Sequence, residues 1–174
     1  MKTSLTWWTE VKASPSLLKD WLVKQYRGEV TAADRIRVLA NQFSVSGQDR
    51  KTLEVIASQE ETHASWVLGL LNARGINPSV ENAEDRYWAS TLPGIDSFET
   101  GTAVAAHAEK MRLERIQVIS EDQDAPEDIQ SVFKKILVDE LFHERAFRSM
   151  STPAAMEKTH GNHELGRKAL GLVA

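Results

Sequence analysis

Apolar residues recur at helical spacing along four long segments of the chain, and no stretch shows the sustained alternation that is typical of strands. The segments begin at capping residues or prolines, and the second has a glycine just past its last apolar position. The pattern predicts an all-α protein with helices over residues 14–43 and 49–75, from about Asp96, and after Asp124 to just before Pro153. Glu99 is expected to complete a capping box at the start of the third helix.

The connections predict how these helices are arranged. The first and last connections are short, so each pair of helices should form an antiparallel hairpin. Residues 76–95 form a longer connection, with a possible short helix around 81–92, which can carry the chain the length of the bundle. We expect one domain over residues 1–174: a four-helix bundle with its core at about 14–150 and one long crossover between helices two and three. The extension over 153–174 is expected to add a short fifth helix, interrupted at Gly161.

Six polar side chains fall on helical stripes that otherwise hold leucine, isoleucine, alanine and phenylalanine. They are Glu29, Glu60, His63, Glu109, Glu140 and His143. Burying an unpaired carboxylate costs roughly several kcal/mol, and four of them would exceed the total stability of about 5–15 kcal/mol that is typical of a domain. Protonation would neutralise some of them, whereas two divalent cations would balance all four carboxylates and accept the two imidazoles as ligands. The pattern indicates a site for two metal ions.

The spacing of these residues indicates a duplicated helical hairpin. Glu60 follows Glu29 by 31 residues, Glu140 follows Glu109 by 31, and each second glutamate is followed by histidine at i+3. The whole set repeats at an offset of 80 residues, and segments 34–38 and 114–118 repeat at the same offset. Residues at i and i+3 of a helix stand on nearly the same face, so each Glu-x-x-His pair can hold one metal or bridge two.

With these motifs, the chain resembles the ferritin-like di-iron carboxylate superfamily over about residues 14–150. The resemblance implies that Glu60 and Glu140 bridge two metal ions. It assigns one terminal carboxylate and one histidine to each ion, drawn from Glu29, Glu109, His63 and His143. Two iron ions are the expected cofactor, and manganese is the alternative for such a mixed oxygen and nitrogen site.

Two features depart from particular members of this superfamily. Rubrerythrin-like peroxidases usually carry a cysteine-ligated iron domain and a further glutamate one turn after the third-helix glutamate. This chain has no cysteine, and Arg112 stands at that position. Several ferritin-like and bacterioferritin-like members place a tyrosine about two turns after the first glutamate, where this chain has Ile36. The first departure weakens the peroxidase interpretation, and the second argues against a tyrosyl relay at that point.

Composition and charge narrow the chemistry and the partners. The absence of cysteine among the 174 residues excludes disulfides, thiolate metal sites and iron–sulfur clusters. A net charge of −4 argues against a broad nucleic-acid-binding surface. The first residues, which include Trp7, Trp8, Glu10 and Lys12, resemble neither a secretory signal nor a membrane span. We therefore expect a cytoplasmic protein with no nucleic-acid or membrane partner.

Three functional hypotheses remain open from the sequence. The first is an oxidoreductase in which a reduced metal pair activates dioxygen or peroxide and acts on an unknown small molecule, with manganese catalase as a variant. The second is a ferroxidase that stores iron, and the third is a metal-free helical interaction module. We expect a homo-oligomer, with a dimer favoured.

The remaining histidines and tryptophans carry weaker predictions. His107 lies two residues before Glu109 and should face away from the site. His160 and His163 fit an accessory metal site or a cap over the main site, but a polar turn around Gly161 is favoured. Packing in the interior is favoured over a substrate channel or an oligomer contact for Trp7, Trp8, Trp21, Trp66 and Trp88.

Overall fold

The computed structural model describes residues 3–80 and 86–172, and helices dominate these residues. Four long helices form a bundle: α2 (Pro15–Gln42), α3 (Gly47–Asn72), α5 (Phe98–Glu121) and α6 (Glu127–Met150). Further helices lie around it: α1 (Ser4–Ala13), α4 (Arg86–Thr91), the 3₁₀ turn η1 (Leu92–Gly94) and α7 (Pro153–Ala169). The predicted all-α fold is confirmed. No helix in the described ranges combines the length and the apolarity that a membrane span requires.

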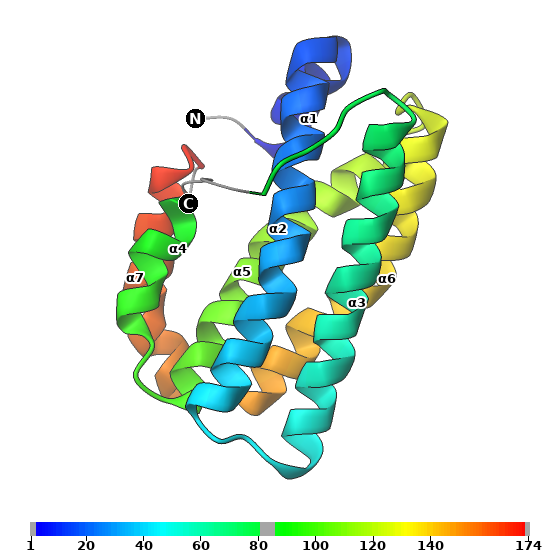
Figure 1. Cartoon of the computed structure of the whole chain (residues 1–174). Coiled ribbons are helices and arrows are strands. Elements are labelled where there is room, and N and C mark those ends of the chain that lie inside the picture. The colour runs from blue at the N-terminus through cyan, green and yellow to red at the C-terminus, as the bar shows by residue number, and fades with distance from the viewer. Residues whose placement is uncertain (1–2, 81–85, 173–174) are drawn as a thin grey trace.

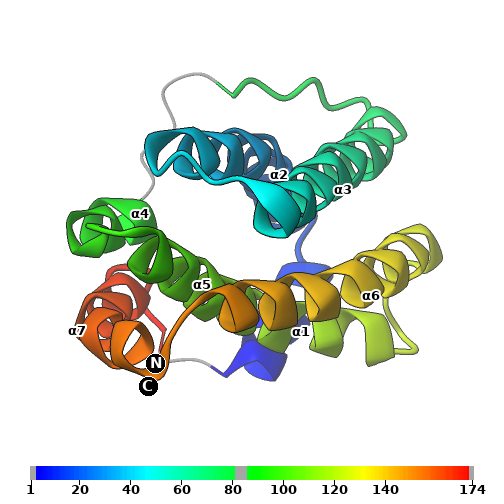
Figure 2. The same cartoon turned by 90° about the horizontal axis from the view of Figure 1, so that it is seen from below.

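The bundle consists of two antiparallel hairpins that pack face to face. The view along the bundle in Figure 2 shows α2 and α3 as one layer and α5 and α6 as the other. Helices α3 and α5 run in the same direction, because the chain returns along the bundle by way of α4 and η1 before α5 begins (Figure 1). The long crossover is therefore confirmed. Helices α4 and α7 pack on each other beside α5.

Local chemistry sets the ends of the bundle helices, with two differences from the prediction. Ser14 caps α2 as expected, by accepting the backbone N–H of Leu17. The capping box of α5 is formed by Ser97 and Thr100, one residue later than predicted. Helix α6 follows Pro126 without a side-chain cap, so the expected cap at Asp124 is wrong. Acidic residues in its first turn interact favourably with the helix dipole instead.

Two flanking helices differ from the prediction. Helix α1 was not predicted, because its three turns carry too short an apolar pattern; Trp8 anchors it by donating an indole hydrogen bond of 2.7 Å to Asp122. Helix α7 continues through Gly161, so the predicted interruption is wrong. A glycine inside a helix costs about 1 kcal/mol relative to alanine. Packing of the face that contains Ala155 and Thr159 offsets that cost. The predicted helix over 81–92 is seen only from Arg86, since residues 81–85 lie outside the described ranges.

The interior of the bundle contains two apolar clusters separated along its axis. One cluster includes Trp8, Trp21, Leu22, Val67, Ile116 and Phe133. The other includes Ala33, Ile36, Ile56, Ala106 and Phe147. On each bundle helix, the predicted polar residues fall between the positions that contribute to these clusters. The fold therefore places a polar layer between two apolar ones, and Trp8 and Trp21 pack in the core as expected.

Candidate metal centre

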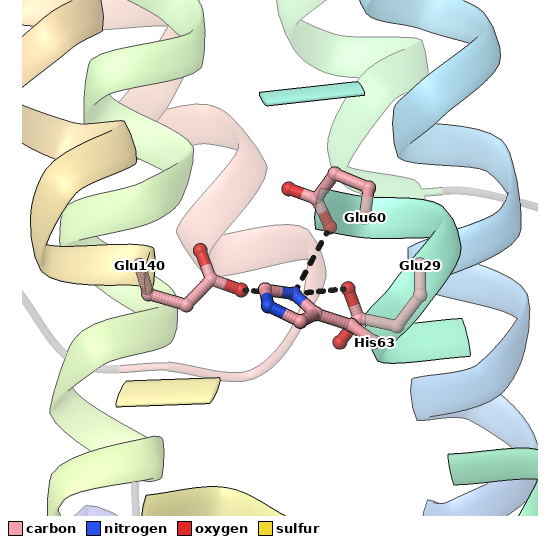
Figure 3. A group of neighbouring side chains, drawn as sticks. All are labelled: Glu29, Glu60, His63 and Glu140. Carbon is pink, nitrogen blue, oxygen red and sulfur yellow. Dashed lines mark ion pairs between the residues drawn. The ribbon is translucent and has the colours of Figure 1, made fainter. Parts of the chain in front are cut away.

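All six predicted side chains lie together in this polar layer. Glu29 comes from α2, Glu60 and His63 from α3, Glu109 from α5, and Glu140 and His143 from α6. Glu109 is 5% exposed, and the other five are fully buried. Figure 3 shows Glu29, Glu60, His63 and Glu140 pointing toward one another from three helices. The inward orientation predicted from the helical stripes is therefore correct for the complete set.

Glu60 and Glu140 each direct one oxygen at each histidine. Glu60 Oε2 lies 3.7 Å from His63 Nδ1, and Glu60 Oε1 lies 3.3 Å from His143 Nδ1. Glu140 Oε1 lies 3.8 Å from His63 Nδ1, and Glu140 Oε2 lies 3.4 Å from His143 Nδ1. Both carboxylates are thus positioned between the two imidazoles, which is the arrangement that a bridging carboxylate requires.

The buried polar atoms at the centre fit a pair of cations. Among the described residues, no hydrogen bond reaches Nδ1 of either histidine or the Oε2 atoms of Glu60, Glu109 and Glu140. Buried polar atoms normally have a partner, so such a group of atoms fits the binding of cations. Two sets of possible ligand atoms are present among the described residues, and within each set the atoms lie within 4.8 Å of one another. Both sets contain Glu60 and Glu140. Glu29 and His63 complete one set, and Glu109 and His143 complete the other.

Arg112, one turn after Glu109 on α5, places its guanidinium among the four carboxylates. Its Nη2 lies 2.6 Å from Glu29 Oε2 and 2.8 Å from Glu140 Oε1. Its Nη1 lies 3.6 Å from Glu109 and 3.7 Å from Glu60. Sequence reasoning treated Arg112 only as a departure from related proteins. Its place one turn after an inward-facing glutamate was the signal for a role in the site.

Burial and mutual repulsion favour the protonated forms of several of these groups. Burial raises the pKa of Glu29 to about 8, although Arg112 opposes the rise. Burial and the neighbouring Glu140 raise the pKa of Glu109 well above its usual range. Burial opposes protonation of His143, but the carboxylates of Glu140 and Glu60 outweigh it and raise the pKa of His143 to about 9. At neutral pH and without metal, the cluster therefore holds protons.

Metal uptake should release these protons, because ligation requires ionised carboxylates and neutral imidazoles. Glu29 and His143, with pKa values of about 8 and about 9, are mostly protonated at pH 7 in chelator-treated protein. Anaerobic addition of two equivalents of Fe(II) or Mn(II) should then release about two protons per chain or more. Affinity should rise with pH from 7 toward 9. Calorimetric titration in two buffers of different ionisation enthalpy measures the release, and a heat independent of the buffer would contradict it.

Each histidine is held by the residue that precedes the Glu-x-x-His motif of the other hairpin. Asp139 Oδ2 lies 3.1 Å from His63 Nε2, and Gln59 Oε1 lies 3.1 Å from His143 Nε2. The Gln59 amide nitrogen donates to Asp139 Oδ1 at 2.9 Å. A carboxylate only accepts, so His63 donates from Nε2, and the Gln59 carbonyl accepts from His143 Nε2. Both Nδ1 atoms are thereby directed at the glutamates. Sequence reasoning missed Gln59 and Asp139, although they repeat at the same offset of 80.

The other histidines lie apart from the site. His163 is buried in α7, where Nδ1 lies 2.8 Å from the Tyr87 hydroxyl and the ring stacks on His107 at 4.7 Å. Burial lowers the pKa of His163 to about 4, so it stays neutral. His107 faces away from the carboxylates, as predicted, with Nε2 3.2 Å from the Met156 carbonyl oxygen. Within the described ranges, only the two sets given above gather three or more ligand atoms. The predicted polar turn is wrong, and His163 instead packs α7 against α4 and α5.

An all-α bundle with one long crossover, which buries four glutamates and two histidines in one cluster, defines a ferritin-like carboxylate protein. The model of the rubrerythrin family matches residues 20–162, and the chain belongs to this family. Members of the family bind di-iron, and the cluster described above is a candidate for such a site. No curated protein and no solved structure matches the chain.

Proposed function

We propose that the chain is an oxidoreductase that holds two iron ions, or manganese in their place, and uses dioxygen or peroxide as the oxidant. The crosswise placement of Glu60 and Glu140, each with one oxygen toward each histidine, is the observation that supports this proposal most directly. A surface ion-pair network would not need four buried carboxylates, three of which have oxygens that accept no hydrogen bond from the described residues. Membership of the rubrerythrin family agrees with it.

The proposed ligand roles follow the two sets of neighbouring atoms. Glu60 and Glu140 would bridge the ions, Glu29 and His63 would complete one position, and the remaining two residues, Glu109 and His143, would complete the other. When bound, the metal pair supplies the redox chemistry toward the oxidant. The chain orients the ligands through Gln59 and Asp139, and the two apolar clusters flank the site along the bundle axis.

Arg112 has a separate role in this proposal. It donates a hydrogen bond to Glu29 Oε2 and lies against Glu140 Oε1, so it holds one terminal and one bridging carboxylate in position. Its charge also offsets part of the negative charge of the cluster before metal binds. A guanidinium is planar and always charged, which suits it to span two carboxylates.

Iron stoichiometry and oxidant consumption test the proposed function. Protein loaded anaerobically with Fe(II) is expected to bind about two ions per chain, then to consume dioxygen or peroxide only in the loaded form. Uptake of many more ions, in a large shell seen by sedimentation, would support the ferroxidase and storage alternative. We propose that the chain forms a homo-oligomer, with a dimer favoured over a shell. A melting temperature unaffected by metal would favour the metal-free interaction module, since binding to the folded state must raise it.

A further inference from the structure

A cavity of about 180 Å³ lies beside the candidate metal centre, between α2, α5 and the crossover segment with α4 and η1. Helix α2 contributes Ile36 and Leu39, and α5 contributes Ala105 and Glu109. The crossover contributes Trp88. Most of the lining is hydrocarbon, and Glu109 is also one of the proposed metal ligands. Glu109 is therefore shared by the cavity and the candidate metal centre.

The exposure of the lining residues indicates that the cavity runs from the surface to the metal centre. Val38 and Leu92 are 61% and 51% exposed and mark the mouth. Ile36 and Phe147 are 7% and 1% exposed and form the inner wall. Glu109, at 5% exposure, lies with them at the inner end. A molecule that enters at the mouth would reach a ligand of the proposed metal pair by passing along Ile36 and Phe147 of the second apolar cluster.

Two observations indicate that the cavity takes a ligand. The first is that, apart from Glu109, α5 presents small residues along it: Gly101, Ala105 and Ala108. Gly101 lets α2 approach closely, since a Cβ there would lie 2.3 Å from Leu39 Cδ1. The second is that Glu109 Oε2 is buried and makes no hydrogen bond with any described residue. Its nearest charged partner is Arg112 Nη1, at 3.6 Å. A mainly apolar cavity with a single polar group at its inner end is typical of a binding site for a small molecule.

We propose that this cavity binds a small, uncharged, mainly hydrocarbon molecule about the size of a substituted benzene. An apolar cavity of roughly 150 Å³ accommodates benzene, so the volume here fits one ring with a small substituent. A charged molecule, whether anion or cation, would lose its hydration against the hydrocarbon wall. Polar atoms come from Gln42 and from Arg35, whose guanidinium lies 4.6 Å over the Trp88 ring. That this ligand is the organic substrate rests on the proposed function, whereas binding itself does not.

Fluorine NMR titration of the full-length protein with fluorobenzene tests the proposal. Binding should be saturable in the wild type. Ala105→Leu and Ala32→Leu fill the cavity from opposite walls, and each should weaken binding by about tenfold or more. Ala169→Leu is the matched control, because Ala169 is half-buried in α7 and does not line the cavity. This variant should bind fluorobenzene as the wild type does. The anion 4-fluorobenzoate should bind at least about tenfold more weakly than fluorobenzene.

The outcomes separate this proposal from the proposed function. Absence of saturable binding, equal binding by the wild type and the folded filling variants, or tighter binding of the anion would overturn the proposal. Binding that disappears as the protein self-associates would overturn it as well, since a second copy would then be the occupant. In Mn(II)-loaded protein, the bound fluorine should relax faster because the ions lie close to the cavity. Binding without faster relaxation supports the cavity assignment and counts against the metal assignment.

Discussion

Replacing Glu60 or Glu140 by alanine is expected to lower the metal content of the protein from about two ions per chain to well below one. Each of these carboxylates faces both histidines, so each substitution removes a ligand from both proposed ions. Loss of an outer partner of a ligand already costs about 10–100-fold in affinity, and loss of a bridging ligand should cost more. Elemental analysis of protein purified without chelator measures the content.

Glu61→Ala provides the matched control for these variants. Glu61 is the next residue on α3, but its side chain is directed outward and forms an ion pair with Arg37. Glu61→Ala removes one carboxylate, as each bridging-residue variant does, and it should leave about two ions per chain. If the wild type and both bridging-residue variants contained almost no metal, the proposed oxidoreductase would be wrong. Equal, full occupancy in all of them would show that the ions bind elsewhere.

Replacing Arg112 by leucine is expected to destabilise the chelated protein far more than the metal-loaded protein. Without metal, the guanidinium lies within 3.7 Å of all four buried carboxylates and offsets part of their charge. Removing one partner of a buried ion pair costs about 3–5 kcal/mol, which lowers the melting temperature of a chain of this size by roughly 6–20 °C. In the metal-loaded protein, two divalent cations still offset the negative charge of the four carboxylates after Arg112 is removed. The rise in melting temperature on metal addition should therefore be larger in Arg112→Leu than in the wild type.

Arg115→Leu is the control for loss of a long cationic side chain from the same helix. The Arg115 guanidinium lies 4.6 Å over the Trp7 ring, so it contributes to packing near α1. Its removal should lower the melting temperature of the chelated and the loaded protein to a similar extent. If Arg112→Leu behaved in the same way, Arg112 would be a packing residue with no electrostatic role at the metal centre.

The sequence predicted the bundle and its polar layer because the informative residues repeat. Glu29 and Glu109 stand on apolar stripes, and the intervals of 31 and 80 residues are too regular for isolated surface charges. A long connection with proline at both ends likewise predicted the parallel arrangement of α3 and α5. These features are the spacing of residues along the chain and the length of a connection, and both can be read directly from the sequence.

The residues that were missed depend on contacts between helices. Gln59 and Asp139 sit about 100° around the helix from the glutamates that follow them, so neither falls on an inward stripe. Their role appears only when α3 and α6 are side by side. Arg112 has a side chain long enough to reach either solvent or the interior, and its direction depends on the charges nearby. Helix α1 is too short to show a clear period, and its position depends on contacts with distant residues such as that of Trp8 with Asp122.

The exchange of supporting side chains between the hairpins has an evolutionary consequence. The imidazole of each half is oriented by a residue of the opposite half, through Asp139 in one direction and Gln59 in the other. If the two halves descend from one duplicated ancestor, that ancestor would have been a single helical hairpin. It would have needed a second copy of itself to orient its histidine, so it would have worked as a dimer of short chains. Fusion into a single gene product then allowed the two supporting positions to diverge. Under that history, glutamine and aspartate would now stand where identical residues once faced each other, and this difference would let the two proposed ion positions acquire unequal properties.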